Sequence, residues 1–438
     1  MGTGNILFLL LLFSAITWFS RNARQLKKNI GLGKDLDRSD RPAERWMTMI
    51  RVALGQSKMV SRPVPALLHI FVYVGFVLIN IEVLEMLIDG AIGTHRIFSF
   101  MGGFYTFLLG FFEILAFLVT FGCVVFLIRR NVLRLKRFIS KDLDGWPRSD
   151  ANIILCSEII LMTALFLMNA SEQVLKDQGI GPYRTAFPGG LPVSSLLAPL
   201  LSSFSPDQLI LIERSCWWLH IIGIFGFLNY LPYSKHLHIV LAFPTTWFSN
   251  LNPKGAFSNL ASVTNEVKAI LDPSFSPPAP ADPSAPLRFG AKDVNDLSWK
   301  QLLDAYSCTE CGRCTSSCPA NQTGKLLSPR KIMMDTRDRL EEVGRNRIEN
   351  KGTYKDDGKN LFSSITAEEL WACTSCNACV QECPVNIDPL SIIIDMRRFL
   401  VMEQSAAPQG LNLMFTNVEN NGAPWQFSPS DRLNWASE

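Results

Sequence analysis

The chain has 438 residues, of which 48% are hydrophobic and only 18% charged, with a formal net charge of +3. A soluble globular protein carries about a quarter charged residues, so this composition excludes an ordinary soluble protein. The small net charge gives no reason to expect a nucleic-acid partner. Apolar runs fill the first part of the chain and most polar sequence follows, which is typical of a membrane domain followed by a soluble one.

Five apolar stretches are long enough to cross the hydrocarbon core, which takes about 20 residues. They lie at 4–20, 65–88, 104–128, 151–170 and 208–232. The first lacks the basic start and small-residue cleavage site of a signal peptide, so we interpret it as a retained anchor.

Basic residues set the expected orientation of these helices. They cluster at 21–28 and 129–137, whereas the loops 89–103 and 171–207 are poor in Lys and Arg. By the positive-inside rule the N-terminus lies outside and the soluble domain lies in the cytoplasm. We therefore expect a multi-pass protein of the inner (cytoplasmic) membrane.

Four of the five histidines lie in or at the ends of apolar stretches, where polar side chains are costly. If one helix continues through both, His220 and His238 share a face about 27 Å apart along its axis, which suits two b-type haems. We expect His69 and His238 to bind an inner haem and His220 an outer one, with His236 as a further candidate ligand. The alternative is that each is a hydrogen-bonded interior histidine.

The segment Leu-Pro-Tyr-Ser-Lys-His-Leu-His-Ile at 231–239 resembles the fifth helix of the nitrate reductase gamma-subunit family and of related heterodisulfide reductase membrane subunits. That resemblance implies a five-helix cytochrome b in which His238, His220 and His69 match haem ligands. Where the gamma subunits have a second histidine on helix two, this chain has Ile79. The resemblance therefore supports one haem b, the inner one, and a second haem would lack that ligand.

Carboxylates also occur within the apolar stretches, at Glu82, Glu113 and Glu158, and Glu213 precedes Arg214. They can face the bundle and pair with arginine. They can also form, with Arg214, a proton path to a quinone, which gains two protons with two electrons. Both interpretations place these side chains inside the bundle.

Eight of the eleven cysteines form two runs of the pattern Cys-x-x-Cys-x-x-Cys-x-x-x-Cys-Pro. In two-cluster ferredoxins the fourth cysteine of such a run binds the other cluster. We therefore expect one [4Fe–4S] cluster on Cys308, Cys311, Cys314 and Cys383, and a second on Cys373, Cys376, Cys379 and Cys318. Zinc held by four thiolates is the alternative.

Helical sequences precede, separate and follow the runs, so residues 296–404 resemble the α-helical ferredoxin domain of heterodisulfide reductase C-type subunits and succinate dehydrogenase iron–sulfur subunits. We expect an all-α protein in four parts. They are a five-helix transmembrane haem b bundle over 1–245, an interfacial segment and proline-rich linker over 246–290, a cytoplasmic two-cluster domain over 291–404 and an irregular tail over 405–438.

The combination resembles the membrane iron–sulfur subunits of heterodisulfide reductase-like complexes. It implies an electron-transfer subunit of a quinone-linked oxidoreductase, relaying electrons between menaquinone or ubiquinone and a cytoplasmic partner. We expect that partner, a cysteine-rich cluster protein or a flavoprotein, to be a separate catalytic chain, because no nucleotide-binding turn or other catalytic group of residues is evident. The alternatives are a haem-free anchor that tethers a ferredoxin module, and a redox-sensing module.

Overall fold

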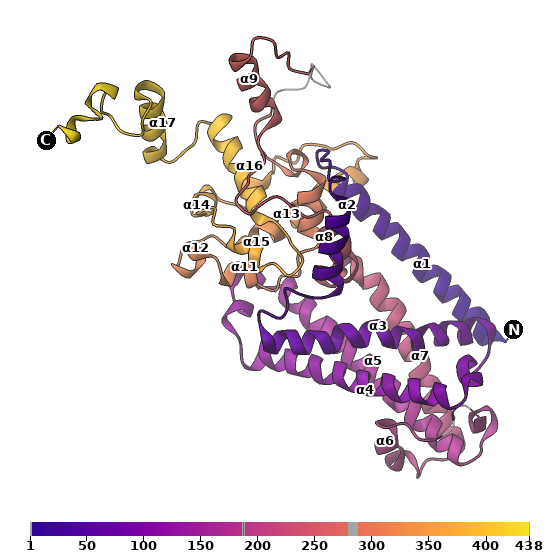
Figure 1. Ribbon diagram of the computed structural model, residues 1–438. Helices are drawn as coiled ribbons and strands as arrows, with labels where there is room; N and C mark the ends of the chain where they lie inside the picture. Colours follow the sequence, from indigo (N-terminus) through magenta and orange to yellow (C-terminus); the bar gives the residue numbers. More distant parts are fainter. Residues whose placement is uncertain (1, 186, 188, 279–287, 438) are drawn as a thin grey trace.

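A computed structural model describes residues 2–185, 187, 189–278 and 288–437. Over these residues the chain is helical and has no strand, only one isolated parallel bridge between Lys34 and Ser298. The expected all-α class is confirmed. Figure 1 shows the long helices of the N-terminal half in the lower part of the molecule and the shorter C-terminal helices above them.

Five helices are long and apolar enough to cross a membrane, and each matches one expected stretch. They are α1 (Thr3–Ile30), α3 (Pro63–Ile92), α4 (Gly103–Leu127), α5 (Trp146–Asp177) and α7 (Pro206–Tyr230). Three of them, α1, α3 and α5, extend beyond the expected stretches at both ends, because polar residues continue these helices past the apolar windows, whereas α4 and α7 end one and two residues before the expected stretches do. A helix suits this environment because it satisfies every backbone N–H and C=O internally.

Small residues allow the long helices to approach closely. A Cβ atom added at Gly75 on α3 would lie 2.3 Å from the Val119 side chain on α4. One added at Gly223 on α7 would lie 2.5 Å from Leu161 on α5. Glycine at a membrane-helix interface lets two backbones pack by van der Waals contact, which holds helices together where the solvent is itself apolar.

The expectation that His220 and His238 share one continuous helix is wrong, because α7 ends at Tyr230. Pro232 has no N–H to donate, and two short 3₁₀ turns lead to α8 (His238–Trp247). The break is pinned by Asp150 on α5, which accepts hydrogen bonds from the Ser234 hydroxyl at 2.7 Å and the Lys235 amide at 3.1 Å.

The C-terminal half packs around a second core built on α10 (Trp299–Tyr306), α13 (Pro329–Glu349) and α16 (Pro389–Met402). The cysteine runs lie beside the short helices α11 (Arg313–Ser316), α12 (Pro319–Gln322), α14 (Ala367–Trp371) and α15 (Ala378–Glu382). Ala53 and Ala242 of the N-terminal half belong to the same core. Thus α8 and α2 (Pro42–Met49) pack together beside this core, as the two views show.

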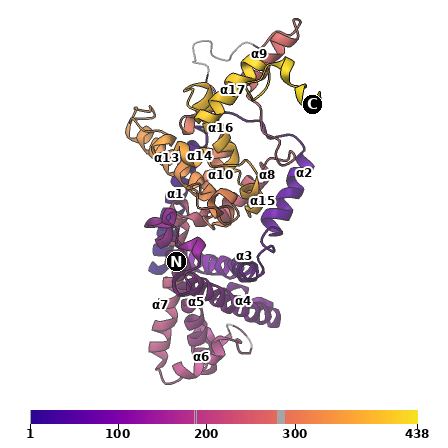
Figure 2. The same cartoon turned by 90° about the vertical axis from the view of Figure 1, so that its left-hand side faces the viewer.

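Remaining helices are α6 (Ser194–Leu201) at the far end of the bundle, α9 (Ala261–Leu271) and α17 (Gln409–Asn421). The expectation of an irregular tail is wrong over α17, which forms a helix with one buried residue, Asn417. It extends away from the rest of the protein (Figures 1 and 2). Of the proline-rich linker, residues 279–287 lie outside the described residues, and 272–278 are not helical.

The first helix ties the two halves together. Near the end of α1, the Asn29 side chain donates a hydrogen bond to the Tyr306 hydroxyl at 3.0 Å. Just beyond, the Lys34 amide donates to the Leu297 carbonyl at 2.7 Å, and the Trp299 amide donates to the Lys34 carbonyl at 3.0 Å. A membrane helix therefore continues directly into the core that carries the cysteine runs.

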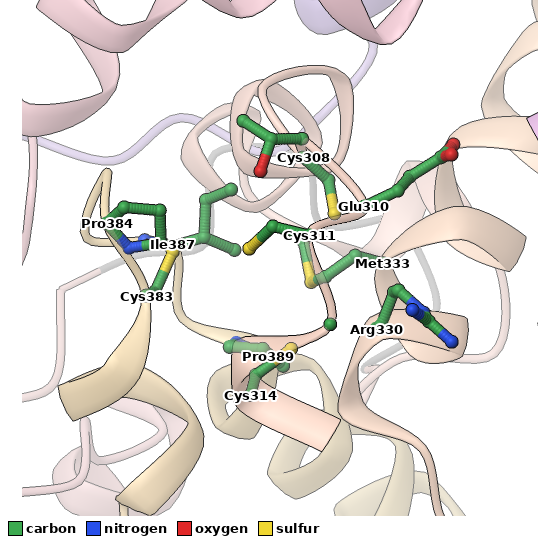
Figure 3. Close-up of a pocket in the computed structure, with 12 residues that line it drawn as sticks. Cys308, Glu310, Cys311, Cys314, Arg330, Met333, Cys383, Pro384, Ile387 and Pro389 are labelled. Carbon is green, nitrogen blue, oxygen red and sulfur yellow. Dashed lines mark hydrogen bonds between the residues drawn. The ribbon is translucent and has the colours of Figure 1, made fainter. Parts of the chain in front are cut away.

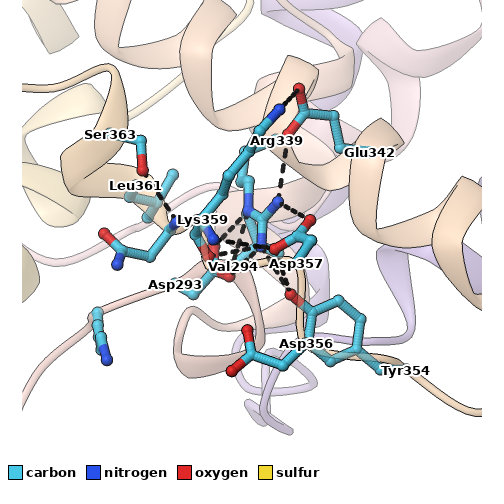
Figure 4. Close-up of polar contacts among 12 residues, drawn as sticks. Asp293, Val294, Arg339, Glu342, Tyr354, Asp356, Asp357, Lys359, Leu361 and Ser363 are labelled. Carbon is cyan, nitrogen blue, oxygen red and sulfur yellow. Dashed lines mark hydrogen bonds and ion pairs between the residues drawn. The ribbon is translucent and has the colours of Figure 1, made fainter.

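The insert between the cysteine runs is fastened by one arginine. Arg339 on α13 pairs with Asp293 at 2.8 Å and with Asp357 at 2.6 Å, and donates to the Tyr354 hydroxyl at 2.9 Å. Figure 4 shows these contacts converging on its guanidinium group. A planar guanidinium group can donate hydrogen bonds to several acceptors at once. The Arg339 side chain therefore holds the loop at 350–360 against Asp293, near the start of the dicluster half.

We predict that Gly344→Val on α13 loosens the join between the halves. A Cβ atom at this position would lie 2.4 Å from the Asn29 side chain, which is 7% exposed. Overpacking of this kind lowers the free energy of unfolding by about 1–3 kcal/mol. The measurement is the midpoint of thermal unfolding in detergent, which should fall. Gly410→Val on α17 is the control, since nothing lies within 4 Å of its position. An equal fall in the unfolding midpoint of both variants would contradict the role assigned to Gly344.

Candidate functional site

Four cysteines from both runs line one pocket, shown in Figure 3. Cys308 and Cys311 come from the loop that leads into α11, Cys314 lies on α11, and Cys383 directly follows α15. We call this group the first cysteine site. The pocket holds about 340 Å³ of space, part of it open to solvent, and Met333 and Ile387 contribute apolar walls.

The other four cysteines, Cys318, Cys373, Cys376 and Cys379, form the second cysteine site. Burial raises the pKa of Cys373 and of Cys379, and the nearby thiol of Cys318 raises both further. Cys376 is exposed, whereas every cysteine of the first site is buried or half-buried. Each site therefore combines three cysteines of one run with the last cysteine of the other.

Both loops adopt the same backbone conformation. Positive φ angles occur at Glu310 (54°) and Gly312 (72°) in the first run and at Ser375 (56°) and Asn377 (59°) in the second. Left-handed residues between helical ones turn backbone N–H groups toward a common point, which suits a negatively charged group. The Ile387 and Ser375 amides donate to the sulfur atoms of Cys383 at 3.3 Å and Cys373 at 3.4 Å.

The donor sets fit [4Fe–4S] clusters. Thiolates are the usual ligands of such clusters, and amides that donate to cysteine sulfur stabilise the added charge. Within the described ranges, no group of three or more His, Cys, Asp or Glu converges tightly enough for a single metal ion. A cubane spreads its thiolates more widely than zinc does, so the zinc alternative fits less well.

A buried ion-pair chain connects the first site to the membrane helices. Glu310, between Cys308 and Cys311, is 5% exposed and pairs with Lys235 and, at 2.8 Å, with Arg337. Although burial opposes it, the charges of Lys235 and Arg337 hold the pKa of Glu310 below its ordinary value of 4.5. Lys235 lies between α7 and α8, beside the histidines.

Contacts from three further cations hold the first site against the membrane side. Lys58, which precedes α3, donates to the Cys383 carbonyl at 3.2 Å. Arg313 donates to the carbonyls of Lys58 at 2.8 Å and Met59 at 3.3 Å. Arg330 pairs with Asp142 in the segment between α4 and α5 at 2.7 Å. The loops at one end of the bundle thus surround the first site.

Three histidines lie beside this end of the bundle. His69, near the start of α3, is close enough to His238 for their charges to interact, and the rings of His236 and His238 lie 5.5 Å apart. Nδ1 of His238 donates to the Lys235 carbonyl at 3.0 Å if it carries the proton, which leaves Nε2 free. Nδ1 of His69 is buried with no hydrogen-bond partner. These residues fit one haem b.

His220 lies deeper in the bundle and has different surroundings. It is 2% exposed, and its Nδ1 lies 3.0 Å from the Leu161 carbonyl. Ile79 on α3 is buried where the gamma-subunit family has a histidine. A haem at this level would therefore lack the ligand that the gamma-subunit family has on its second helix.

A polar network occupies the opposite end of the bundle. Arg96 donates to Glu82 at 2.9 Å, to Glu172 at 2.8 Å and to the Asn169 side chain at 2.6 Å. Asn169 in turn donates to Glu113 at 3.1 Å. The interpretation that Glu82 pairs with arginine is confirmed, and Glu82 and Glu113 share one network.

The remaining expected residues lie apart from this chain of bonds. Arg214 pairs with its neighbour Glu213 and, with Arg96, lines a small pocket. Glu213 also accepts a hydrogen bond from the Tyr183 hydroxyl at 3.0 Å. Glu158 is half-buried on α5 near Cys123, away from the Arg96 network. The structure therefore brings Arg214 to the network's pocket but not Glu158.

The geometry defines a membrane protein with a cysteine-rich helical domain, and comparison with known proteins specifies the domain. Residues 304–387 match the family described as 4Fe-4S dicluster domain. This segment is therefore a 4Fe–4S dicluster domain. No solved structure matches the chain.

Relatives match far more of the chain. It is 27% identical to a probable iron-sulfur-binding oxidoreductase, FadF, of Bacillus subtilis, over 99% of this chain and 61% of the relative. It is also 27% identical to the EtfAB:quinone oxidoreductase of Syntrophomonas wolfei, over 92% of this chain and 55% of the relative. The chain thus spans little more than half the length of each relative.

A third relative matches the cluster half. It is the C-type subunit of the ferredoxin/F(420)H(2)-dependent CoB-CoM heterodisulfide reductase of Methanosarcina acetivorans, which is 32% identical over 24% of this chain and 53% of the relative. The expected resemblance to heterodisulfide reductase-like iron–sulfur subunits is confirmed. Together with the five apolar helices, these similarities support iron–sulfur electron transfer in a multi-pass membrane protein.

Several residues that shape the site were missed in the sequence. Arg313 and Glu310 lie inside the first cysteine run, where the second run has Ala378 and Ser375, and this difference was a usable signal. Asp150 and Lys58 gave none, because their partners are distant in sequence.

We predict that Glu310→Gln strongly destabilises the protein. The change leaves Lys235 and Arg337 without their shared carboxylate, and removing one partner of a buried pair costs roughly 3–5 kcal/mol. Thermal unfolding in detergent at neutral pH measures the loss. The control is Glu349→Gln at the exposed end of α13, a residue that makes no ion pair within the described residues. An unchanged unfolding midpoint in Glu310→Gln would refute the role assigned to this ion-pair chain.

Proposed function

We propose that the protein relays electrons between a quinone in the membrane and a soluble redox partner, using one haem b and two [4Fe–4S] clusters. The observation that carries this proposal is the contact between the histidine group and the first cysteine site through Lys235 and Glu310. One-electron carriers must lie close together to exchange electrons, and these two groups of ligands occupy the same end of the bundle.

For the clusters, we propose crossed ligation. Cys308, Cys311, Cys314 and Cys383 hold one, and Cys373, Cys376, Cys379 and Cys318 hold the other, as the shared pocket and the neighbouring thiols suggest. When bound, the clusters supply one-electron carriers whose potentials depend on charge, hydrogen bonds and solvent. The chain itself would bind them and fix their spacing, and Met333 and Ile387 give the first site apolar walls.

For the haem, we propose that His69 and His238 would hold it. The Lys235 carbonyl orients His238 by accepting a hydrogen bond from its Nδ1–H, a type of support that fixes ring direction and raises ligand basicity. His236, whose ring also contacts Phe227 at 5.2 Å between centroids, helps to enclose the site. Because α3 has Ile79 where the gamma-subunit family has a second histidine, His220 lacks a matching ligand, and we propose a single haem.

For proton exchange, we propose the network around Arg96. Glu82 and Glu172 pair with one guanidinium group there, Glu113 joins the network through Asn169, and Arg214 with Glu213 lines the same small pocket. Carboxylates in excess over buried cations are suited to bind and release protons, as a quinone requires when it takes up or yields two electrons. Glu158 lies outside this network, so we leave it out of the path.

The expected orientation is part of the proposal. With the dicluster domain in the cytoplasm of an inner-membrane protein, the soluble partner reaches the second cysteine site at the exposed Cys376. One relative is named an EtfAB:quinone oxidoreductase and another a heterodisulfide reductase subunit. We accordingly propose a flavoprotein or a cysteine-rich cluster protein as the partner and menaquinone or ubiquinone as the quinone.

We predict that Cys383→Ser and Cys311→Ser affect the same cluster although they lie in different runs. Each should lower the non-haem iron content from about eight to about four atoms and leave the same residual EPR signal in the reduced protein. Cys318→Ser and Cys376→Ser should both remove the cluster at the second site and leave the EPR signal of the cluster at the first site. If Cys383→Ser instead matches Cys376→Ser, the ligation is not crossed.

We predict that the purified protein contains one haem b per chain and that quinone reoxidises its reduced clusters. His69→Ala and His238→Ala should abolish both the haem spectrum and reoxidation by a water-soluble quinone analogue. A reduced-minus-oxidised spectrum with pyridine-haem quantification and stopped-flow absorbance are the measurements.

The matched control is His220→Gln, which can keep the hydrogen bond to the Leu161 carbonyl and should retain the haem. Absence of b-type absorption in the unmodified protein would support the haem-free anchor instead. Loss of one of two haems in His220→Gln would contradict a single haem.

A further inference from the structure

The two cysteine sites share ligand types and backbone conformation but differ in fixed charge. Around the first site lie Lys58, Arg137 and Arg313, and within the described residues none of them has a carboxylate within ion-pair distance. Lys58 reaches the Cys383 carbonyl, and both Arg137 and Arg313 are close enough to Cys311 for charge interaction. Arg313 is 3% exposed, so little water screens it.

Other charged groups near the first site are already neutralised. Arg330 pairs with Asp142, Glu310 with Lys235 and Arg337, and Arg62 with Glu382 at 3.3 Å. The three uncompensated cations therefore dominate the local field.

The second site has a more balanced environment. Arg397 donates to the Cys373 carbonyl at 2.5 Å and to the Leu370 carbonyl at 2.6 Å, and it stacks over Trp371. Asp388 lies near Cys379 and supplies the opposite charge. One cation and one carboxylate therefore face the second site, against three cations at the first.

We infer that Lys58, Arg137 and Arg313 raise the reduction potential of the cluster at the first site above that of the cluster at the second. Reduction adds a negative charge to a cluster, and nearby positive charge stabilises the reduced form. Water at Cys376 also stabilises the reduced form of the second cluster. Three fixed charges, of which Arg313 is buried and Lys58 and Arg137 are half-buried, outweigh a single exposed ligand, since Coulomb energies grow as the effective dielectric constant falls.

This order gives the relay a direction, and the inference rests on the proposed function. A reduced flavin or cluster of the partner gives one electron to the second cluster, which is oxidised again as the first is reduced. Two such transfers, with two protons taken up at the quinone, yield one quinol. Flow from the exposed face to the membrane is then downhill inside the protein.

Redox titration of the purified, cluster-loaded protein followed by EPR tests the order, with chemical reductants and no quinone or partner. The cysteine variants above assign each signal to its site. The first site should titrate at the higher potential, and Lys58→Gln and Arg313→Gln should lower only that midpoint. A tenfold change in the ratio of reduced to oxidised cluster corresponds to about 59 mV for one electron.

Matched variants address the second site. Arg397→Gln should lower only its midpoint, and Ala378→Arg, which places in the second run the arginine of the first, should raise it. If Lys58→Gln or Arg313→Gln loses a cluster, Arg137→Gln serves instead, because its side chain makes no hydrogen bond within the described residues.

A lower or equal midpoint at the first site, or midpoints that ignore these charges, overturns the inference. Reoxidation of the clusters by quinone would persist in that case. A failure of this inference can therefore be told apart from a failure of the proposed function.

Discussion

The arrangement of this protein depends on one buried carboxylate held between two cations. Glu310 stands inside the first cysteine run, and Lys235 reaches it from the break between the last membrane helix and α8. A charged group buried away from water is tolerated only where it is paired. The Glu310 carboxylate must therefore stay beside its cations, and this requirement fixes the position of Lys235 relative to the first cysteine run. Because Asp150 fixes the same break, the histidines and the cysteines are positioned by one set of bonds.

The two halves form a continuous structure through this region. The core of the dicluster domain includes Ala53 and Ala242 from the membrane half, and α1 runs from the bundle to Tyr306. A boundary drawn at 245 therefore separates residues that fold together. Electron carriers benefit from such a join, because small displacements between them change transfer rates, and a shared core limits those displacements.

The electrostatics of the two ends serve different purposes. At the cluster end, cations without carboxylate partners surround the first cysteine site and act on whatever charge is placed there. At the opposite end, carboxylates gather around Arg96 in a network of hydrogen bonds. The separation follows the proposed chemistry, in which electrons enter near the cysteines and protons are exchanged near the quinone.

The sequence by itself determined the five membrane helices and the two cysteine runs, because apolar length and ligand spacing are local properties. It also indicated His238, through the pattern that begins at Pro232, and His69, through its place near the end of an apolar stretch. Only the tertiary structure decided that α7 stops at Tyr230, that α17 is helical, and that Arg313 and Lys58 face the first site. Those features depend on partners far away in the chain, and a pattern within one segment carries no record of them.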